Sequence, residues 1–145
     1  VPPEHVVLTA STSEAYALLF KLLADPGDRV LIPIPCYPLF EYLAALESVE
    51  AVPYPCLWSE GGWFLDFSAL EERIDGRTRA LIFVSPNNPT GAMLRPEEAD
   101  RLLAVCRDRG PLTCPPAPSR STWARSTRTG STWTCVWRRR PPSAA

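Results

Sequence analysis

The sequence SPNNPTG, residues 85–91, follows a short apolar run at residues 79–84 and precedes a predicted helix. A buried strand should therefore end where this loop begins, and loops after parallel strands are where open α/β sheets bind ligands. The two prolines each fix a φ angle and remove a backbone donor, and the glycine permits a tight turn. We expect a stiff loop that aims the amide of Asn88. An ordinary Asn/Pro/Gly turn is an equally good interpretation of the loop alone.

Charge divides the chain of 145 residues, which is long enough for one domain at most. Residues 1–110 carry nine basic and sixteen acidic residues, a net charge of −7, whereas residues 111–145 carry six arginines and no acidic residue. The acidic part argues against a nucleic-acid surface on residues 1–110. The chain as a whole has a net charge of −1.

Cysteine spacing indicates neither a disulfide framework nor a zinc site, and no metal is expected. The five cysteines form no Cys-x-x-Cys pair, and one would remain after any pairing. Reduced thiols in a cytoplasmic protein are the simpler interpretation. The apolar runs are too short to span a membrane, and the first residues do not resemble a secretory signal.

Hydrophobic periodicity and turn residues predict strands that alternate with helices. Predicted helices cover residues 12–24, 39–46, about 66–74 and 96–109, and predicted strands cover residues 30–33, 50–54 and 79–84. Residues 58–63 are expected to be a loop. This alternation indicates an α/β fold with a mostly parallel sheet, with too few strands to complete a doubly wound domain.

The chain changes character abruptly after Gly110. Residues 111–145 consist mainly of Pro, Ser, Thr and Arg with three Trp, and they show neither helical nor strand periodicity. No order is therefore expected there. The interpretations left open are a disordered tail, a stretch read in a shifted frame, and a binder of single-stranded nucleic acid through Arg and Trp. The sharp break, just after a helix that should lead into a strand, favours the shifted frame.

Two further features precede the SPNNPTG loop. Ser11, Thr12 and Ser13 lie at the start of a helix, where free N–H groups and the helix dipole attract anions. Tyr37 lies between two prolines directly after a strand, where its ring could stack on a flat ligand. Taken singly, the first feature is more often a helix cap and the second a packed surface tyrosine.

The order and spacing of these features resemble the fold-type I pyridoxal-phosphate aminotransferases of class I/II. The strings LTASTSEAY, DPGDRVLIPIPCYPLF and VSPNNPTG carry the resemblance, which covers roughly residues 4–110. It implies an incomplete three-layer αβα arrangement belonging to the large cofactor domain. It also implies that Ser11, Thr12 and Ser13 hold the cofactor phosphate, that Tyr37 stacks on the pyridine ring, and that Asn88 hydrogen-bonds O3′.

The resemblance further implies amino-group transfer from an amino acid to a 2-oxo acid, with a homodimer as the common assembly. Such an enzyme needs a lysine that forms a Schiff base with the cofactor. The one lysine here, Lys21, points away from the apolar stripe of its helix. The Asp and Tyr that the family places on the next strand have no counterpart after Gly110. We therefore expect no catalytic residue in this chain and no catalysis by it alone.

Two alternatives to an aminotransferase remain. One is a non-catalytic piece that binds pyridoxal phosphate or phosphate, or that is inert. The other is a pyridoxal-phosphate-dependent lyase of the same fold.

Overall fold

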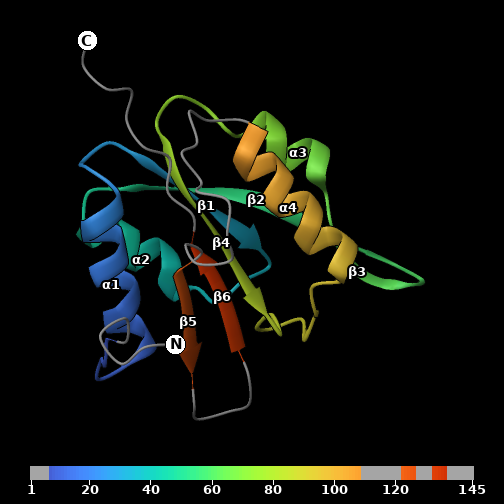
Figure 1. Cartoon of the computed structure of the whole chain (residues 1–145), viewed down its shortest axis with the longest axis horizontal. Coiled ribbons are helices and arrows are strands. Elements are labelled where there is room, and N and C mark those ends of the chain that lie inside the picture. The colour runs from blue at the N-terminus through green and yellow to red at the C-terminus, as the bar shows by residue number, and fades with distance from the viewer. Residues whose placement is uncertain (1–6, 109–121, 127–131, 137–145) are drawn as a thin grey trace.

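The computed structural model of the chain describes residues 7–108, 122–126 and 132–136. Its helices and strands alternate along most of this length (Figure 1). In chain order they are α1 (Thr12–Leu23), β1 (Arg29–Ile34), α2 (Leu39–Leu46), β2 (Glu50–Ser59), β3 (Gly62–Leu65), α3 (Phe67–Glu72), β4 (Thr78–Ser85), α4 (Pro96–Asp108), β5 (Thr122–Ser126) and β6 (Thr132–Val136).

The strands form one mixed sheet in the order β3-β2-β1-β4-β6-β5. Its centre is parallel, with β1 between β2 and β4, and Leu31 pairs with Val52 on one side and with Leu81 on the other. The flanking strands β3, β6 and β5 join in antiparallel pairs. The carboxyl ends of β1 and β4 therefore lie beside each other at one edge of the sheet, which is called the carboxyl edge below.

Helices cover both faces of this sheet, with α1 and α2 on one side and α3 and α4 on the other (Figure 1). Alternation along β4 explains how one strand serves two cores, because successive side chains point to opposite faces. Ile82 and Val84 pack with α1 and α2, whereas Leu81 and Phe83 pack with α3 and α4. The predicted α/β class and the incomplete three-layer αβα arrangement are confirmed.

Local signals in the sequence account for where α1 and α3 begin. The Ser11 hydroxyl accepts a hydrogen bond from the Glu14 N–H (3.1 Å), and the Asp66 carboxylate caps α3 through the Ala69 N–H (3.0 Å). Among the buried side chains, Tyr54 of β2 reaches across the sheet and donates its hydroxyl to the Ile82 carbonyl of β4 (2.7 Å). That bond satisfies the hydroxyl of Tyr54, whose side chain is fully buried.

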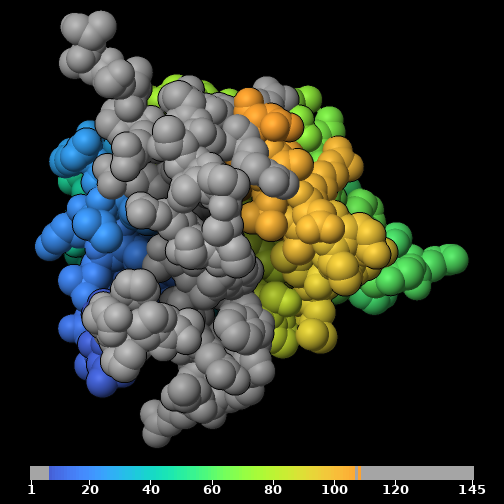
Figure 2. All heavy atoms as spheres, viewed as in Figure 1, coloured from blue at the N-terminus to red at the C-terminus, as the bar shows by residue number. Residues whose placement is uncertain are grey.

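Residues 58–63, expected to be a loop, instead complete a hairpin between β2 and β3. The aromatic side chains of Trp58 and Trp63 pair across the two strands with their ring centroids 5.6 Å apart. Aromatic cross-strand pairs of this kind stabilise hairpins, and Gly62 adopts the positive φ of 106° that begins the return strand. The hairpin projects beyond the body of the molecule, and Figure 2 shows its green tip standing clear of the surface.

The sequence predicted no regular structure after Gly110, whereas the structure has β5 and β6 there. Strand β6 pairs antiparallel with β4, and β5 pairs with β6. The edge of β4 supplies backbone partners, and both segments contain the Thr and Trp residues that favour strands. The rest of residues 111–145 lies outside the described part, and the division of the chain at Gly110 stays a prediction.

Among the described residues, no helix has both the length and the apolar character needed to cross a bilayer.

Candidate functional site

The start of α1 lies toward the carboxyl edge of the sheet. Helix α1 ends at Leu23, only a few residues before β1 begins at the opposite edge, so the helix runs back along the sheet from its first residue. Figure 1 shows the dark blue start of α1 at the same end of the molecule as the arrowhead of β4. The predicted phosphate-binding residues are thus at the edge where the loops after β1 and β4 begin.

The first turn of α1 offers donors that the helix itself does not use. Ser11 has extended backbone angles (φ −155°, ψ 166°), and Ser11 and Thr12 are exposed while Ser13 is half-buried. The first N–H groups of a helix have no acceptor within the helix, so they face outward with the hydroxyls. The Glu14 carboxylate accepts the Ala10 N–H (2.6 Å) and adds a negative charge beside this turn. The N–H and hydroxyl donors would attract an anion bound here, and the Glu14 carboxylate would repel it.

Tyr37 lies in the turn between β1 and α2 with 48% of its surface exposed. The Phe40 N–H donates to the Tyr37 carbonyl (3.4 Å), which ties the tyrosine to the start of α2. Phe40 in turn packs edge-on against Tyr16 of α1, with ring centroids 4.7 Å apart. The tyrosine turn is therefore connected to the first part of α1 through packed rings, while the Tyr37 ring itself stays accessible.

The loop after β4 folds back on itself around Asn87. The Asn87 N–H donates to the Ala92 carbonyl (2.7 Å), and the Gly91 N–H donates to the Asn87 carbonyl (2.7 Å). Gly91 adopts a φ of 69°, which a residue with a side chain rarely tolerates. Asn88 is exposed at the outer side of this loop. The amide predicted to contact a ligand is thus free to do so.

A direct hydrogen bond joins the Asn88 loop to the Tyr37 turn. It runs from the Asn87 side-chain Nδ2 to the Pro35 carbonyl and measures 2.8 Å. The structure therefore brings the segments carrying Tyr37 and Asn88 together. Sequence reasoning singled out Asn88 and missed Asn87, although the doubled asparagine after a proline was the available signal.

The Cys36 thiol next to Tyr37 is not a reactive group. Burial, with a smaller contribution from Glu41, raises the pKa of Cys36 to about 11. Burial, together with the nearby Glu98 and Cys36, also raises the pKa of Cys56 to about 11. Both thiols stay protonated at neutral pH, so neither supplies the thiolate that a nucleophile requires.

Lys21 lies far from this edge. Its ammonium group pairs with the Glu47 carboxylate after α2 at 3.5 Å, and its side chain is 69% exposed. It lies nine positions after Thr12 on α1, which corresponds to about 14 Å along the helix axis. It is therefore placed to support the packing of α1 beside α2 and does not face the candidate site.

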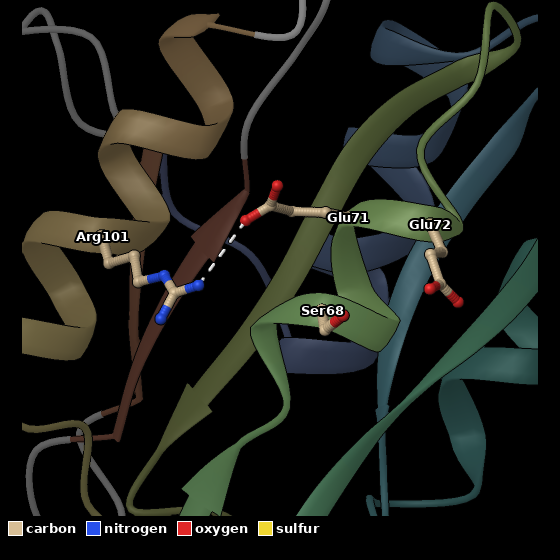
Figure 3. Close-up of a pocket in the computed structure, with 4 residues that line it drawn as sticks. All are labelled: Ser68, Glu71, Glu72 and Arg101. Carbon is tan, nitrogen blue, oxygen red and sulfur yellow. Dashed lines mark ion pairs between the residues drawn. The ribbon is translucent and has the colours of Figure 1, made fainter.

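A shallow pocket between α3 and α4, on the other face of the sheet, is lined by Ser68, Glu71, Glu72 and Arg101. Figure 3 shows Arg101 pointing toward Glu71, with which it forms an ion pair of 3.8 Å. The Arg101 guanidinium also lies 4.3 Å from the centroid of the Phe67 ring. Its charge is thus already used in packing α4 on α3. Among the described residues, no cluster of three or more His, Cys, Asp or Glu side chains could hold a metal.

Comparison with known protein families gives a match over most of the chain. A family model described as aminotransferase class I and II matches residues 1–113. Alanine aminotransferase from Mycobacterium tuberculosis strain H37Rv is 38% identical over 104 residues, which are 72% of this chain and 24% of that protein. Glutamate-pyruvate aminotransferase AlaA from Escherichia coli K12 is 34% identical over 107 residues, 74% of this chain and 26% of that protein. The chain thus spans about a quarter of the length of these curated relatives.

Solved structures share the fold. Alanine aminotransferase from Pyrococcus furiosus superposes with a TM-score of 0.71 at 33% identity and covers 75% of this chain and 28% of that one. Cystalysin from Treponema denticola, described as containing a pyridoxal 5′-phosphate cofactor, gives the same TM-score and coverage at 24% identity. At that identity the second likeness concerns the fold alone.

Proposed function

Because the chain belongs to the class I and II aminotransferase family, we propose that it forms part of a pyridoxal-phosphate-dependent aminotransferase. The observation that carries the proposal is the gathering of polar and aromatic residues, most of them exposed, at one edge of the sheet. All of them lie within the residues that the family model matches, 1–113. They are Ser11, Thr12, Ser13, Tyr37 and Asn88.

Each part of this edge suits one part of the cofactor. The first turn of α1, with Ser11, Thr12 and Ser13, would hold the phosphate through N–H and hydroxyl donors. The exposed ring of Tyr37 would stack on the pyridine ring, and the exposed amide of Asn88 would donate to its O3′. When bound, pyridoxal phosphate supplies an electron sink for the carbanion at the amino-acid Cα. The residues of this chain bind and orient the ring for that chemistry.

We do not assign a catalytic residue to these 145 residues. The only lysine, Lys21, is paired with Glu47 at the other end of α1. Proton transfer at the substrate and covalent attachment of the cofactor would need groups other than those described. The proposed role of the chain is thus to hold and orient the cofactor within a larger enzyme.

The substrates, the assembly and the cellular location of the enzyme are part of the same proposal. The substrates would be an amino acid and a 2-oxo acid, in a biosynthetic process, and the assembly would be a homodimer. A cytoplasmic location is supported by Cys36, Cys56 and Cys106, which are free thiols.

A cofactor-binding piece without catalysis is the second candidate, and the placement of Lys21 favours it for this chain in isolation. A lyase is less well supported, because two lyase structures that share the fold, the cystalysin above among them, are only 24% identical.

Equilibrium dialysis of the purified chain against pyridoxal phosphate tests the proposal. We expect saturable binding that the double substitution Ser11→Ala/Ser13→Ala weakens, because it removes hydroxyl donors from the phosphate. Ser59→Ala, which alters an exposed serine on the β2–β3 hairpin, is the matched control and should bind as the unaltered chain does. Equal retention by all three proteins would contradict the assignment of the phosphate site.

Incubation with an amino acid and pyridoxal phosphate separates the two candidates. We expect no 2-oxo acid product from the isolated chain. Product formation that is abolished by Asn88→Ala would show catalysis by the chain itself and would rule out the second candidate.

A further inference from the structure

Asn87 is buried between two exposed neighbours. Its residue surface is only 6% exposed, whereas Pro86 and Asn88 are both exposed. Its side chain therefore points beneath the loop while the Asn88 amide stays outside. Asparagine is seldom buried unless its polar atoms are used, so the contacts of this side chain need an explanation.

The Asn87 amide nitrogen makes two hydrogen bonds. Nδ2 donates to the Pro35 carbonyl (2.8 Å), in the turn after β1, and to the Thr90 hydroxyl (3.0 Å), in its own loop. The Pro35 carbonyl can only accept, which fixes the side-chain orientation with the NH₂ group toward the Tyr37 turn. Pro35 lies two residues before Tyr37, so this bond links the backbone that carries the ring with the backbone that carries the Asn88 amide.

The other atom of the same amide is unsatisfied. Asn87 Oδ1 is buried and has no hydrogen-bond partner within the part of the chain that the structure describes. A buried acceptor without a partner is unfavourable, and an aliphatic side chain of the same shape would avoid this cost. Packing alone therefore does not explain an asparagine at this position, whereas the two bonds from Nδ2 do.

We infer that Asn87 is a positioning residue, which fixes the distance between the Tyr37 ring and the Asn88 amide so that one flat ligand can engage both. The inference rests on the proposed function, because the ligand it positions for is pyridoxal phosphate. Without the bond to Pro35, this direct link between the two loops would be lost, and each loop would be less fixed relative to the other. Ligand binding would then have to include the free-energy cost of ordering one loop relative to the other, and the affinity would fall.

The first experiment tests the link between the loops without any ligand. Asn87→Leu keeps the shape of the side chain and removes its donor. Thr90→Val is the matched control, because it removes the second acceptor and leaves the bond to Pro35. In ¹⁵N-labelled full-length chain we expect the backbone amide signals of Cys36 and Tyr37 to shift and to exchange faster in Asn87→Leu, and to stay unchanged in Thr90→Val.

The second experiment compares two ligands by equilibrium dialysis. For Asn87→Leu we expect pyridoxal phosphate to bind about three- to tenfold more weakly, while inorganic phosphate, which needs only the start of α1, binds unchanged. In the Tyr37→Ala background the same substitution should change pyridoxal phosphate binding by less than about twofold, because a residue acting through Tyr37 has lost its target. A general folding defect would weaken both ligands and would add to the effect of Tyr37→Ala.

The outcomes are distinguishable. Unmoved Cys36 and Tyr37 signals in Asn87→Leu, or equal losses for both ligands, would overturn the inference. If the unaltered chain bound neither ligand, the proposed function would fail, while the amide signals would still decide whether Asn87 holds the turn. Asn87→Ala is measured in parallel, and failure of both variants to fold would assign Asn87 to folding and would overturn its positioning role.

Discussion

The two edges of the parallel strands use polar residues in opposite ways. At the edge where β1 and β4 begin, called the amino edge here, charged side chains pair with one another. Arg29 contacts Glu50 at 3.0 Å and Asp75 at 2.6 Å, and Arg79 contacts Asp28 at 2.9 Å. At the carboxyl edge, Ser11, Thr12, Tyr37 and Asn88 are exposed to solvent.

This difference indicates that one edge contributes to the stability of the fold and the other to ligand binding. Groups whose partners lie within the chain have little left for a ligand, while exposed donors and rings can bind one without a prior break in the structure. Substitutions at the amino edge should therefore change the free energy of unfolding, and those at the carboxyl edge should change ligand affinity; Ser11, which also caps α1, should change both. Four substitutions test this contrast, in order of their expected effect on stability.

Asp28→Ala should have the largest effect. The Asp28 carboxylate accepts hydrogen bonds from Arg79 and from the Asp25 N–H, and the Asp28 and Arg79 side chains are only 10% and 16% exposed. Removal of the carboxylate leaves the Arg79 charge buried without its partner, so we expect the free energy of unfolding in urea to fall by about 3 kcal/mol. Glu50→Gln, in an exposed pair, is the control and should cost less than about 1 kcal/mol. Equal losses of stability in the two variants would contradict the expected difference between a buried and an exposed ion pair at this edge.

Ser11→Ala should lower the free energy of unfolding by about 1 kcal/mol, because it removes the cap of α1. Ser13→Ala provides the comparison, since Ser13 lies within the helix and does not cap it. If both hydroxyls donate to a phosphate, both variants should bind it more weakly while only the first is destabilised. Urea unfolding and phosphate dialysis on the same samples measure the two effects. A Ser13→Ala variant as unstable as Ser11→Ala would count against the cap.

Asp75 should make a smaller, pH-dependent contribution at the amino edge. Burial alone would raise its pKa, but hydrogen bonds from Arg29, Thr78 and the Arg77 backbone together lower it. A carboxyl group with a lowered pKa in the folded state stabilises the fold above its unfolded pKa, and this stabilisation is lost as the pH falls through the folded pKa.

We therefore expect Asp75→Asn to be less stable than the unaltered chain at neutral pH, by less than about 1 kcal/mol because the side chain is 39% exposed. The difference should shrink as the pH drops below about 4. Urea unfolding across this pH range measures it. A difference that stays constant with pH would show that the Asp75 charge is not responsible.

Tyr37→Ala should have the smallest effect on stability and a clear effect on binding. The ring is exposed, so we expect the free energy of unfolding to change by no more than about 0.5 kcal/mol. Loss of stacking should weaken pyridoxal phosphate binding by about two- to tenfold in dialysis. Tyr42→Ala removes another exposed tyrosine, on α2, and should change neither quantity. A comparable loss of binding in both variants would argue against a specific ring contact.

Much of the central fold was predictable because its signals are local. Alternation of buried residues along β4 follows from the pleat, and the cap of α1 follows from Ser11 at the start of an apolar periodic segment. The strands β3, β5 and β6 were not predicted, since each depends on pairing with a strand that its own sequence does not specify.

The candidate site was predictable residue by residue only in part. The types and spacing of Ser11, Tyr37 and Asn88 pointed to segments that the structure places at the carboxyl edge, and their role in binding stays a prediction. Which of the two asparagines turns inward is decided by the Pro35 carbonyl, 52 residues away along the chain, so local sequence could not distinguish them. The pairing of Lys21 with Glu47 likewise depends on how α1 packs beside α2.

The β2–β3 hairpin has a consequence for self-association. The sheet ends on that side with β3, a strand of four residues that begins at a glycine and turns away from the body of the molecule. A short, projecting edge presents few free N–H and C=O groups to an incoming strand from another copy. At high concentration the β3 edge should therefore be a poor template for intermolecular sheets or for fibril growth.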